Sequence, residues 1–322
     1  MTIKSIFKIS AGISFIFLSL LMVTGWGLGG GYIPSDSEAF SSILYLRNMG
    51  GVGQMIRSLH FYLSSSLIIS GFIFLISFYI LGYVSRFTKQ WYFSLIIYFL
   101  IVGSCFTGYL LPMDQNAFWG TLVRLGIVET IPFFGTFIAN ILRGGLTIGS
   151  ETLSRFFTIH SSIIPIFLSV ISLVLIQSQW ENIKLIVSRA SILYGTILGV
   201  ILLYYWAFSF SAPLELPANP IDVEYIPRPE WYFLWLFEFG KYVEWAPWIR
   251  SALLPLLGTL FLFGLPFIKQ QSSKQRYTIA ITWCSVWLIL TGITLYADRN
   301  LPDKLDYEAA MFVEAKENYQ SL

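Results

Sequence analysis

The sequence predicts an all-α polytopic membrane protein with seven transmembrane helices. It is 56% hydrophobic and only 12% charged, about half the charged share of a typical soluble domain. Seven stretches lack Asp, Glu, Lys and Arg, and each reaches the ~18–20 residues that cross ~30 Å of hydrocarbon. These stretches are 9–35, 58–85, 90–113, 156–180, 190–214, 251–268 and 277–297. A soluble core of seven such helices would be very unusual, so we expect each stretch to span a membrane.

The first stretch follows Lys4 and Lys8 and therefore also resembles a secretory signal peptide. Its apolar region is too long for one, and no small-residue cleavage pattern closes it. We expect it to stay in the protein as the first span.

The distribution of Lys and Arg predicts the orientation, because cytoplasmic loops are enriched in these residues. With a cytoplasmic N-terminus, Glu181 is the single acid on the inner side, and all other acids lie outside or at helix ends facing outward. The inner side then holds Lys4, Lys8, Arg86, Lys89, Lys184, Arg189, Lys269, Lys274 and Arg276. After seven crossings the C-terminus lies outside. The net charge of +2 does not indicate a nucleic-acid partner.

Two long outer connections, 114–155 and 215–250, separate the expected spans, and loops of this length are usually functional. Residues 129–145 have an amphipathic middle, which suggests a helix on the membrane surface. The polar tail 298–322 is expected outside as a short helix. Cys105 and Cys284 lie in apolar runs without a CxxC motif, so we interpret them as buried structural thiols.

His60 and His160 are the only histidines, and both lie inside predicted spans near the outer face. An isolated buried histidine is more often a satisfied structural group than a ligand. Two of them on different helices at similar depth favour a functional site, because ionisable groups inside a membrane are rare. Imidazoles from two facing helices can hold a low-spin haem inside a helix bundle.

Arg57 and Arg155 precede the histidines by about one turn, where haem propionates need cationic partners. Gly25 and Gly108 lie toward the outer ends of their spans, where glycine lets a flat macrocycle approach the backbone. Ordinary small-residue helix packing is the alternative for each glycine.

Several motifs carry a family resemblance. TGWGLGGGYIPSDSEAFSSILYL, IRSLH, GYLLPMDQNAFWG, IPFFG, ILRGG and TLSRFFTIH occur in order, and RPEWYFLWLFE follows in the second long loop. Together they resemble cytochrome b of quinol-oxidising bc-type complexes over about residues 10–270. LPMDQ and ILRGG lean toward the split cytochrome b of photosynthetic b–f complexes. We therefore expect a cytochrome b6-like four-helix haem-binding region at 1–185, a fused subunit IV-like three-helix region at 186–297, and the tail.

The resemblance implies one haem b with two histidine ligands, His60 and His160, and with Arg57 and Arg155 near its propionates. It also implies a quinol-oxidation site in the outer half of the membrane. The residues expected there are Pro229, Glu230, Trp231, Tyr232, Phe106, Tyr109 and Gly120.

The chemical role of Glu230 follows from its residue type. Desolvation at a membrane-embedded site raises the proton affinity of a carboxylate, which can then accept a proton from a quinol hydroxyl. A surface acid in a polar loop is the alternative.

The chain departs from the family at the inner haem. A second histidine is expected about 14 residues after each of the first two, but Phe74 and Val174 stand there. Ser94 replaces the glycine expected beside that haem, and the cysteine that anchors an extra c-type haem in b–f complexes is missing. The sequence therefore predicts one haem, and the usual inward route for the second electron lacks its inner haem.

We expect a haem-b electron-transfer subunit in a bacterial cytoplasmic membrane. Its expected partners are a Rieske-type iron–sulfur protein, c-type cytochromes or both, in a homodimeric complex of the kind the family forms. One alternative is a structural membrane anchor with a relic quinol site, and a haem assay would distinguish it from an electron-transfer subunit. A second alternative is a transporter. The transporter is disfavoured because the spans carry no mid-membrane acid or base apart from the histidines.

Overall fold

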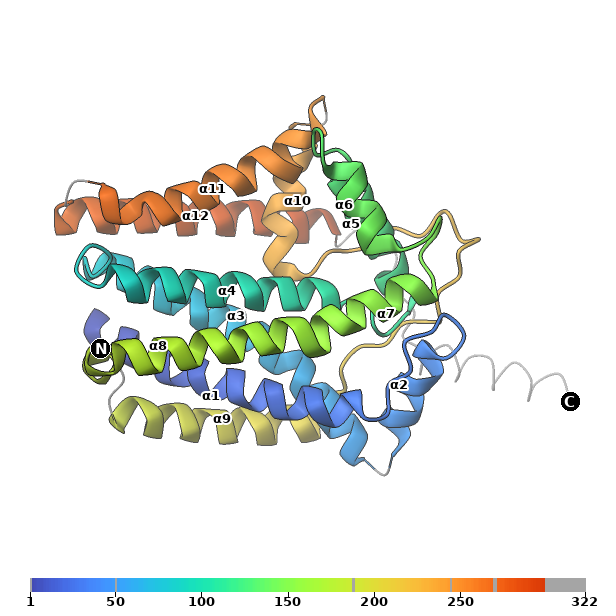
Figure 1. Ribbon diagram of the computed structural model, residues 1–322, viewed down its shortest axis with the longest axis horizontal. Coiled ribbons are helices and arrows are strands. Elements are labelled where there is room, and N and C mark those ends of the chain that lie inside the picture. Colours follow the sequence, from blue (N-terminus) through green and yellow to red (C-terminus); the bar gives the residue numbers. More distant parts are fainter. Residues whose placement is uncertain (1, 50, 187–188, 244, 269–270, 299–322) are drawn as a thin grey trace, which may run out of the picture.

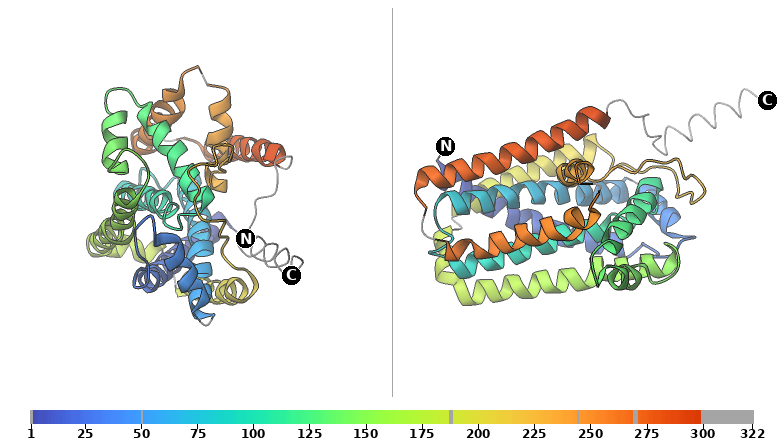
Figure 2. Two further views of the ribbon diagram at one scale, coloured as in Figure 1. Left: turned by 90° about the vertical axis from the view of Figure 1, so that its right-hand side faces the viewer. Right: turned by 90° about the horizontal axis from the view of Figure 1, so that it is seen from above.

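The computed structural model describes residues 2–49, 51–186, 189–243, 245–268 and 271–298, and within these ranges the regular elements are all helices. The helices that form the bundle lie side by side (Figures 1 and 2). They are α1 (Ile3–Gly29), α3 (Val52–Ile80), α4 (Thr88–Gly108), α8 (Ile164–Ile186), α9 (Arg189–Ser209), α11 (Leu254–Gly264) and α12 (Ser273–Asp298). The predicted all-α class is confirmed.

Short helices gather at the end of the bundle opposite the start of α1, here called the loop end (Figure 1). They are α2 (Ala39–Asn48), α5 (Gln115–Glu129), α6 (Gly135–Arg143) and α7 (Ser150–Thr158). A further short helix, α10 (Leu234–Lys241), packs on α12. The α6 helix occupies the predicted amphipathic segment, while residues 299–322 of the predicted tail helix lie outside the described residues.

Five helices in the described part of the chain are long and apolar enough to cross a membrane. They are Ile3–Gly29, Val52–Ile80, Thr88–Gly108, Ser150–Ser178 and Ser273–Ala297. The other two predicted spans correspond to shorter apolar stretches, Leu193–Leu203 and Leu254–Phe267.

Proline explains two irregular turns. A π-helical turn at Ile159–Ile163 joins α7 to α8 just before Pro165, and another at Ile249–Leu253 precedes Pro255. Proline has no N–H for the carbonyl four residues earlier and crowds it, so the helix locally adopts wider turns. The first of these turns contains His160.

The helices of the C-terminal part flank the first four on different sides. Helix α9 packs mainly on α1 and α3, whereas α12 packs on α3 and α11 on α4. A methyl group at Gly195 of α9 would lie 3.0 Å from the backbone of Gly12, so this glycine permits a close helix crossing.

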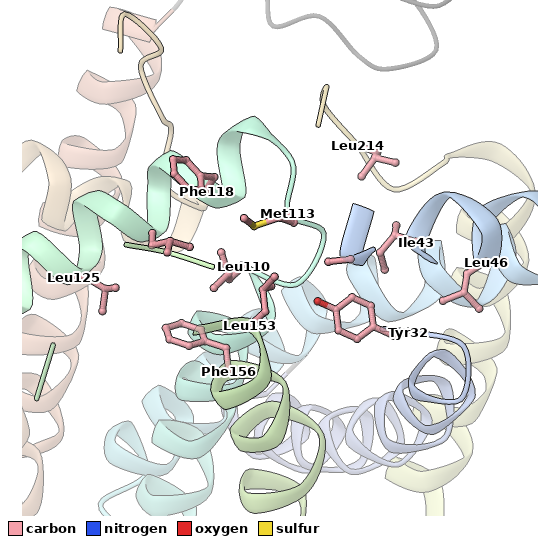
Figure 3. Packing of buried hydrophobic residues seen from close by; sticks show 12 residues of the cluster. Tyr32, Ile43, Leu46, Leu110, Met113, Phe118, Leu125, Leu153, Phe156 and Leu214 are labelled. Atoms are coloured by element: carbon pink, nitrogen blue, oxygen red, sulfur yellow. The ribbon is translucent and has the colours of Figure 1, made fainter. Parts of the chain in front are cut away.

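The loop end has its own core, shown in Figure 3. Leu110 and Met113 follow α4, Leu153 and Phe156 belong to α7, and Leu214 comes from the connection after α9. All five side chains are buried. Because this cluster joins both long connections, it fixes the second one onto the first four helices.

An aromatic cluster fills the opposite end of the bundle. Phe7 stacks on Phe74 with ring centroids 5.1 Å apart and 12° between their planes. Phe78 packs edge-on against Phe7 and lies 5.5 Å from the ring of Trp91. The position where the family's second histidine would stand on α3 is therefore part of an apolar core.

Candidate functional site

The two histidines face each other near the loop end. His60 lies on α3 and His160 in the π-helical turn before α8, and their ring centroids are 6.0 Å apart. Two imidazoles bound on opposite sides of one metal ion, at about 2 Å per nitrogen–metal bond, would have centroids roughly 6 Å apart. The spacing of the rings therefore fits a single metal between them.

Hydrogen bonds set which ring nitrogen is available. Nδ1 of His160 lies 2.9 Å from the carbonyl oxygen of Ser104, which can only accept, so Nδ1–H is the donor. Nδ1 of His60 lies 3.0 Å from the hydroxyl of Thr24, which itself donates to the Leu20 carbonyl. In the neutral rings the proton is thus on Nδ1, and each Nε2 keeps the lone pair that a metal ion needs.

This donor set fits a haem with two imidazole ligands. Both rings come from facing helices, and their spacing matches one iron. Two imidazoles leave the other coordination positions of a metal ion open, and the nitrogens of a macrocycle can fill them.

The two glycines make room for the histidines themselves. A methyl group at Gly108 would lie 2.5 Å from Cε1 of His160, and one at Gly25 would lie 3.0 Å from Cε1 of His60. Both distances are shorter than ordinary van der Waals contact. The nearest groups to these glycines are thus the imidazole edges, while the predicted contact with a macrocycle stays a prediction.

Arg57 and Arg155 are both bonded to backbone. Nη1 and Nη2 of Arg57 donate to the carbonyls of Ala212 and Pro213 at 2.7 and 2.6 Å. Arg155 donates to the carbonyl of Ile141. Each guanidinium has five N–H groups, so these bonds leave the predicted propionate role neither supported nor contradicted.

The turn 113–116 holds the second long connection against the first. Asp114 caps α5 by accepting from the Ala117 N–H at 2.9 Å, and its other oxygen accepts from the Glu215 N–H at 3.1 Å. Met113 has φ of 50°, which residues other than glycine rarely adopt, and its carbonyl accepts from Ala218. Hydrogen bonds to backbone N–H groups of α5 and of the second long connection thus hold this turn in place.

The two residues after Asp114 extend the attachment toward the predicted quinol site. Gln115 accepts from the Asn219 N–H at 2.7 Å, and Asn116 accepts from the Arg228 N–H at 2.9 Å. Arg228 directly precedes residues 229–232, here called the PEWY segment, so the turn positions the start of this segment.

Three side-chain contacts fix the PEWY segment to α3 and α4. The Tyr109 hydroxyl donates to the Arg228 carbonyl at 3.0 Å, and Nε1 of Trp231 donates to Ser65 at 3.3 Å. The Tyr232 hydroxyl is hydrogen-bonded to Cys105. Pro229 is half-buried beside them.

Tyr109 also gathers the remaining predicted quinol-site residues. A methyl group at Gly120 would lie 2.9 Å from Cε1 of Tyr109, so glycine is needed for this approach. The guanidinium carbon of Arg124 lies 3.6 Å from the centroid of the Tyr109 ring and 5.6 Å from that of Phe106. Phe106, Tyr109 and Gly120 therefore lie together, as the sequence predicts, with an arginine among them.

The electrostatic setting of Glu230 suits a proton acceptor. Burial raises the pKa of its carboxyl above the ordinary value, Arg124 partly opposes this rise, and Asp114 adds to it. Burial likewise raises the pKa of Asp114, against the two backbone N–H groups that lower it. Glu230 thus takes up a proton at a higher pH than an exposed glutamate would.

Sequence reasoning missed several of these residues. Arg124 is the single charged residue between Asp114 and Glu129, and this isolation within an apolar helix was a usable signal. The hydroxyl groups of Thr24, Ser65 and Ser104 carried no such signal, because serine and threonine are common in these helices.

Known proteins resemble this chain along most of its length. The Cytochrome b/b6/petB family model matches residues 1–179, more than half of the chain. A cytochrome bc complex cytochrome b subunit of Chlorobaculum thiosulfatiphilum is 27% identical over 316 residues, which cover 90% of this chain and 73% of the relative. Cytochrome b6 of Euglena gracilis is 32% identical over 163 residues, 50% of this chain and 76% of the relative.

A solved structure shares the fold. A chain of a hyperthermophilic respiratory Complex III superposes with a TM-score of 0.75 at 20% identity, covering 94% of this chain and 85% of that one. The 316-residue match also extends well past the first four helices, which agrees with the predicted fusion to a subunit IV-like part. The chain therefore belongs to the cytochrome b/b6/petB family.

Proposed function

We propose that this chain is the haem-b electron-transfer subunit of a quinol-oxidising, bc-type membrane complex. His60 and His160 would hold one haem b, and Glu230 would take a proton from quinol bound beside Tyr109, Phe106 and Gly120. The relatives named above include a subunit of a cytochrome bc complex, and haem is typical of the family.

One observation carries the proposal. Trp231 of the PEWY segment bonds Ser65, which follows His60 by little more than one turn of α3. The residue after the predicted proton acceptor is thus attached to the same stretch of α3 that carries the predicted haem ligand His60. This proximity is what a site needs if quinol is to pass an electron to a metal centre.

The residues divide the chemistry between them. Oxidation of one quinol to quinone releases two protons and two electrons. Glu230 accepts one hydroxyl proton and the second is released on the outer side. Tyr109 and Gly120 shape the surface beside Glu230, and Tyr232 closes the region toward α4. Bound haem supplies a reversible one-electron Fe³⁺/Fe²⁺ couple, and a partner outside the membrane takes the other electron.

Further parts of the proposal concern the setting of the subunit. The stretches Leu193–Leu203 and Leu254–Phe267 lie alongside the five longer apolar helices, which supports seven crossings (Figure 1). With a cytoplasmic N-terminus in a bacterial inner membrane, the loop end faces outward. A Rieske-type iron–sulfur protein or a c-type cytochrome would dock there, in a homodimeric assembly.

Replacement of Glu230 tests the proposal. Glu230→Gln keeps the shape of the side chain but removes the base, so turnover of quinol by the purified complex should fall ~100- to 10,000-fold. Because burial raises the pKa of Glu230, the wild-type rate should climb with pH as this carboxyl loses its proton, above the ordinary carboxyl range. The variant should lack that climb.

The matched control is Glu224→Gln, which removes an exposed acid from the same connection and should leave turnover unchanged. Both variants should keep their haem. Unchanged turnover of Glu230→Gln at saturating quinol would exclude Glu230 as the proton acceptor.

A further inference from the structure

A buried arginine lies within the predicted quinol site without a function so far assigned to it. Arg124 is on α5, with its guanidinium over the ring of Tyr109 at 3.6 Å and near that of Phe106 at 5.6 Å. Its Nη1 atom is buried, and no described residue accepts a hydrogen bond from it. The contact with Tyr109 holds the guanidinium close to that ring, so this unused donor stays within the predicted quinol site.

Such an arrangement indicates a missing acceptor. A buried donor without a partner loses its hydration without compensation, which costs ~1–3 kcal/mol and more for a charged group. Each such group in a native protein has a cause, and a catalytic role or a bound molecule that completes it is among the usual ones. The surrounding residues, two aromatic rings, a glycine and the PEWY segment, match a flat molecule with an oxygen at its edge.

We infer that Arg124 is a quinol-binding residue whose Nη1 donates a hydrogen bond to a ring oxygen of the bound quinol or quinone. This inference rests on the proposed function. When Glu230 accepts the hydroxyl proton, the O–H bond breaks, its electron pair stays on the ring oxygen, and the positive charge of Arg124 stabilises that oxygen.

The groups around Glu230 are consistent with Glu230 as the proton acceptor and Arg124 as the group that stabilises the ring oxygen. Arg124 is the cation that acts on it, while Asp114, Tyr109, Tyr232 and Cys105 supply acidic or neutral groups. Arg124 lowers the pKa of Glu230, so removing the cation should move the acidic limb of the pH–rate profile to higher pH. An arginine with only this electrostatic effect on Glu230 would move that limb but leave the affinity for quinone unchanged.

The test measures binding as well as turnover, on the purified complex. Calorimetric titration with an oxidised short-chain benzoquinone and an oxidised short-chain naphthoquinone gives the dissociation constants. Loss of one charge-assisted hydrogen bond in Arg124→Gln should weaken binding of the preferred quinone by roughly 10- to 100-fold. Arg124→Lys should recover part of the loss. Arg143→Gln removes a different cation, one that is paired with Glu129, and should change neither the dissociation constant nor the pH–rate profile.

A measurement on the wild type guards against a variant that fails to fold. In the infrared spectrum of the wild-type complex, one carbonyl band of the bound quinone should lie below its position in solution. Two unshifted carbonyl bands would overturn the inference whatever the variants do. So would an unchanged affinity for quinone in a haem-loaded Arg124→Gln, and both results would leave the proposed function intact. If the wild type neither binds nor oxidises quinols, the proposed function fails and the role of Arg124 with it.

Discussion

Single atoms around the histidines decide whether the pair can bind a metal. The Ser104 carbonyl and the Thr24 hydroxyl accept from the two Nδ1–H groups, so both Nε2 lone pairs remain available. Bonds of this kind orient a ligand ring and raise its basicity. The glycines on α1 and α4 let the rings reach these acceptors, because any side chain there would occupy the same space.

The closest of these contacts gives a prediction. In Gly108→Ala the new methyl group would meet Cε1 of His160 at 2.5 Å, so the ring must shift away from Ser104. Overpacking of this kind costs ~1–3 kcal/mol. We expect the variant to lose much of its haem, measured as pyridine haemochrome per chain, and to unfold at a lower temperature.

Gly292→Ala is the matched control, since a methyl group at that position of α12 has no neighbour within 4 Å. It should keep its haem. Full haem content and an unaltered low-spin spectrum in Gly108→Ala would show that His160 does not occupy the described position in the loaded protein.

At the scale of elements, a four-residue turn connects two parts of the chain that are about 100 residues apart. Asp114, Gln115 and Asn116 each use a side-chain oxygen to accept a backbone N–H from the second connection. The PEWY segment therefore depends on this turn for its position, although it belongs to no long helix.

Asp114→Asn should loosen the attachment. Asparagine offers one acceptor oxygen where aspartate offers two, so its NH₂ group would face one of the two N–H donors. Leaving that donor unsatisfied costs ~1–3 kcal/mol. Hydrogen–deuterium exchange should speed up in peptides covering 213–228. Asp36→Asn, an exposed acid bonded to Ser150, should leave those peptides protected, and equal protection in both variants would contradict the role of the turn.

For the whole molecule, the two ends of the bundle differ in kind. The loop end carries the paired histidines and the PEWY segment, whereas Phe7, Phe74, Phe78 and Trp91 fill the other end. Val174, where the family's fourth histidine would stand, is 43% exposed on the outside of α8. Neither Phe74 nor Val174 can ligate iron, so these two positions offer no ligands to a second haem.

One haem per chain is the resulting prediction, because the only two histidines are used together. Pyridine haemochrome analysis should give about one haem b per chain, and His60→Ala should remove it.

Between that haem and the far face lies a gap of ~20 Å, from the rise of about 14 helical residues. Electrons should cross it too slowly for turnover.

Stopped-flow reduction of the haem, followed by its reoxidation, tests whether electrons reach the far face too slowly for turnover. Inhibitors of the inner quinone site in ordinary bc complexes should have no effect on the isolated subunit. Two haems per chain, or fast reoxidation by quinone that such an inhibitor blocks, would show that an inner site survives.

Composition and residue order alone determined the all-α class and the family, and they gave most of the residues proposed for the site. Long uncharged runs have few alternatives to membrane helices, since every backbone polar group must be satisfied within the segment. The two histidines were readable because imidazoles are rare inside such runs. Phe74 and Val174 were equally readable as replacements for ligands.

Only the tertiary structure decided which groups complete the site. Arg124 and Glu230 are far apart in the chain, and their electrostatic contact depends on the turn 113–116 folding the second connection back onto α4. The imidazole edges beside Gly25 and Gly108 were not predictable for the same reason, because spacing along a helix gives depth but not which neighbour fills the space. Local patterns fix how each helix forms, whereas long-range packing fixes which side chains meet.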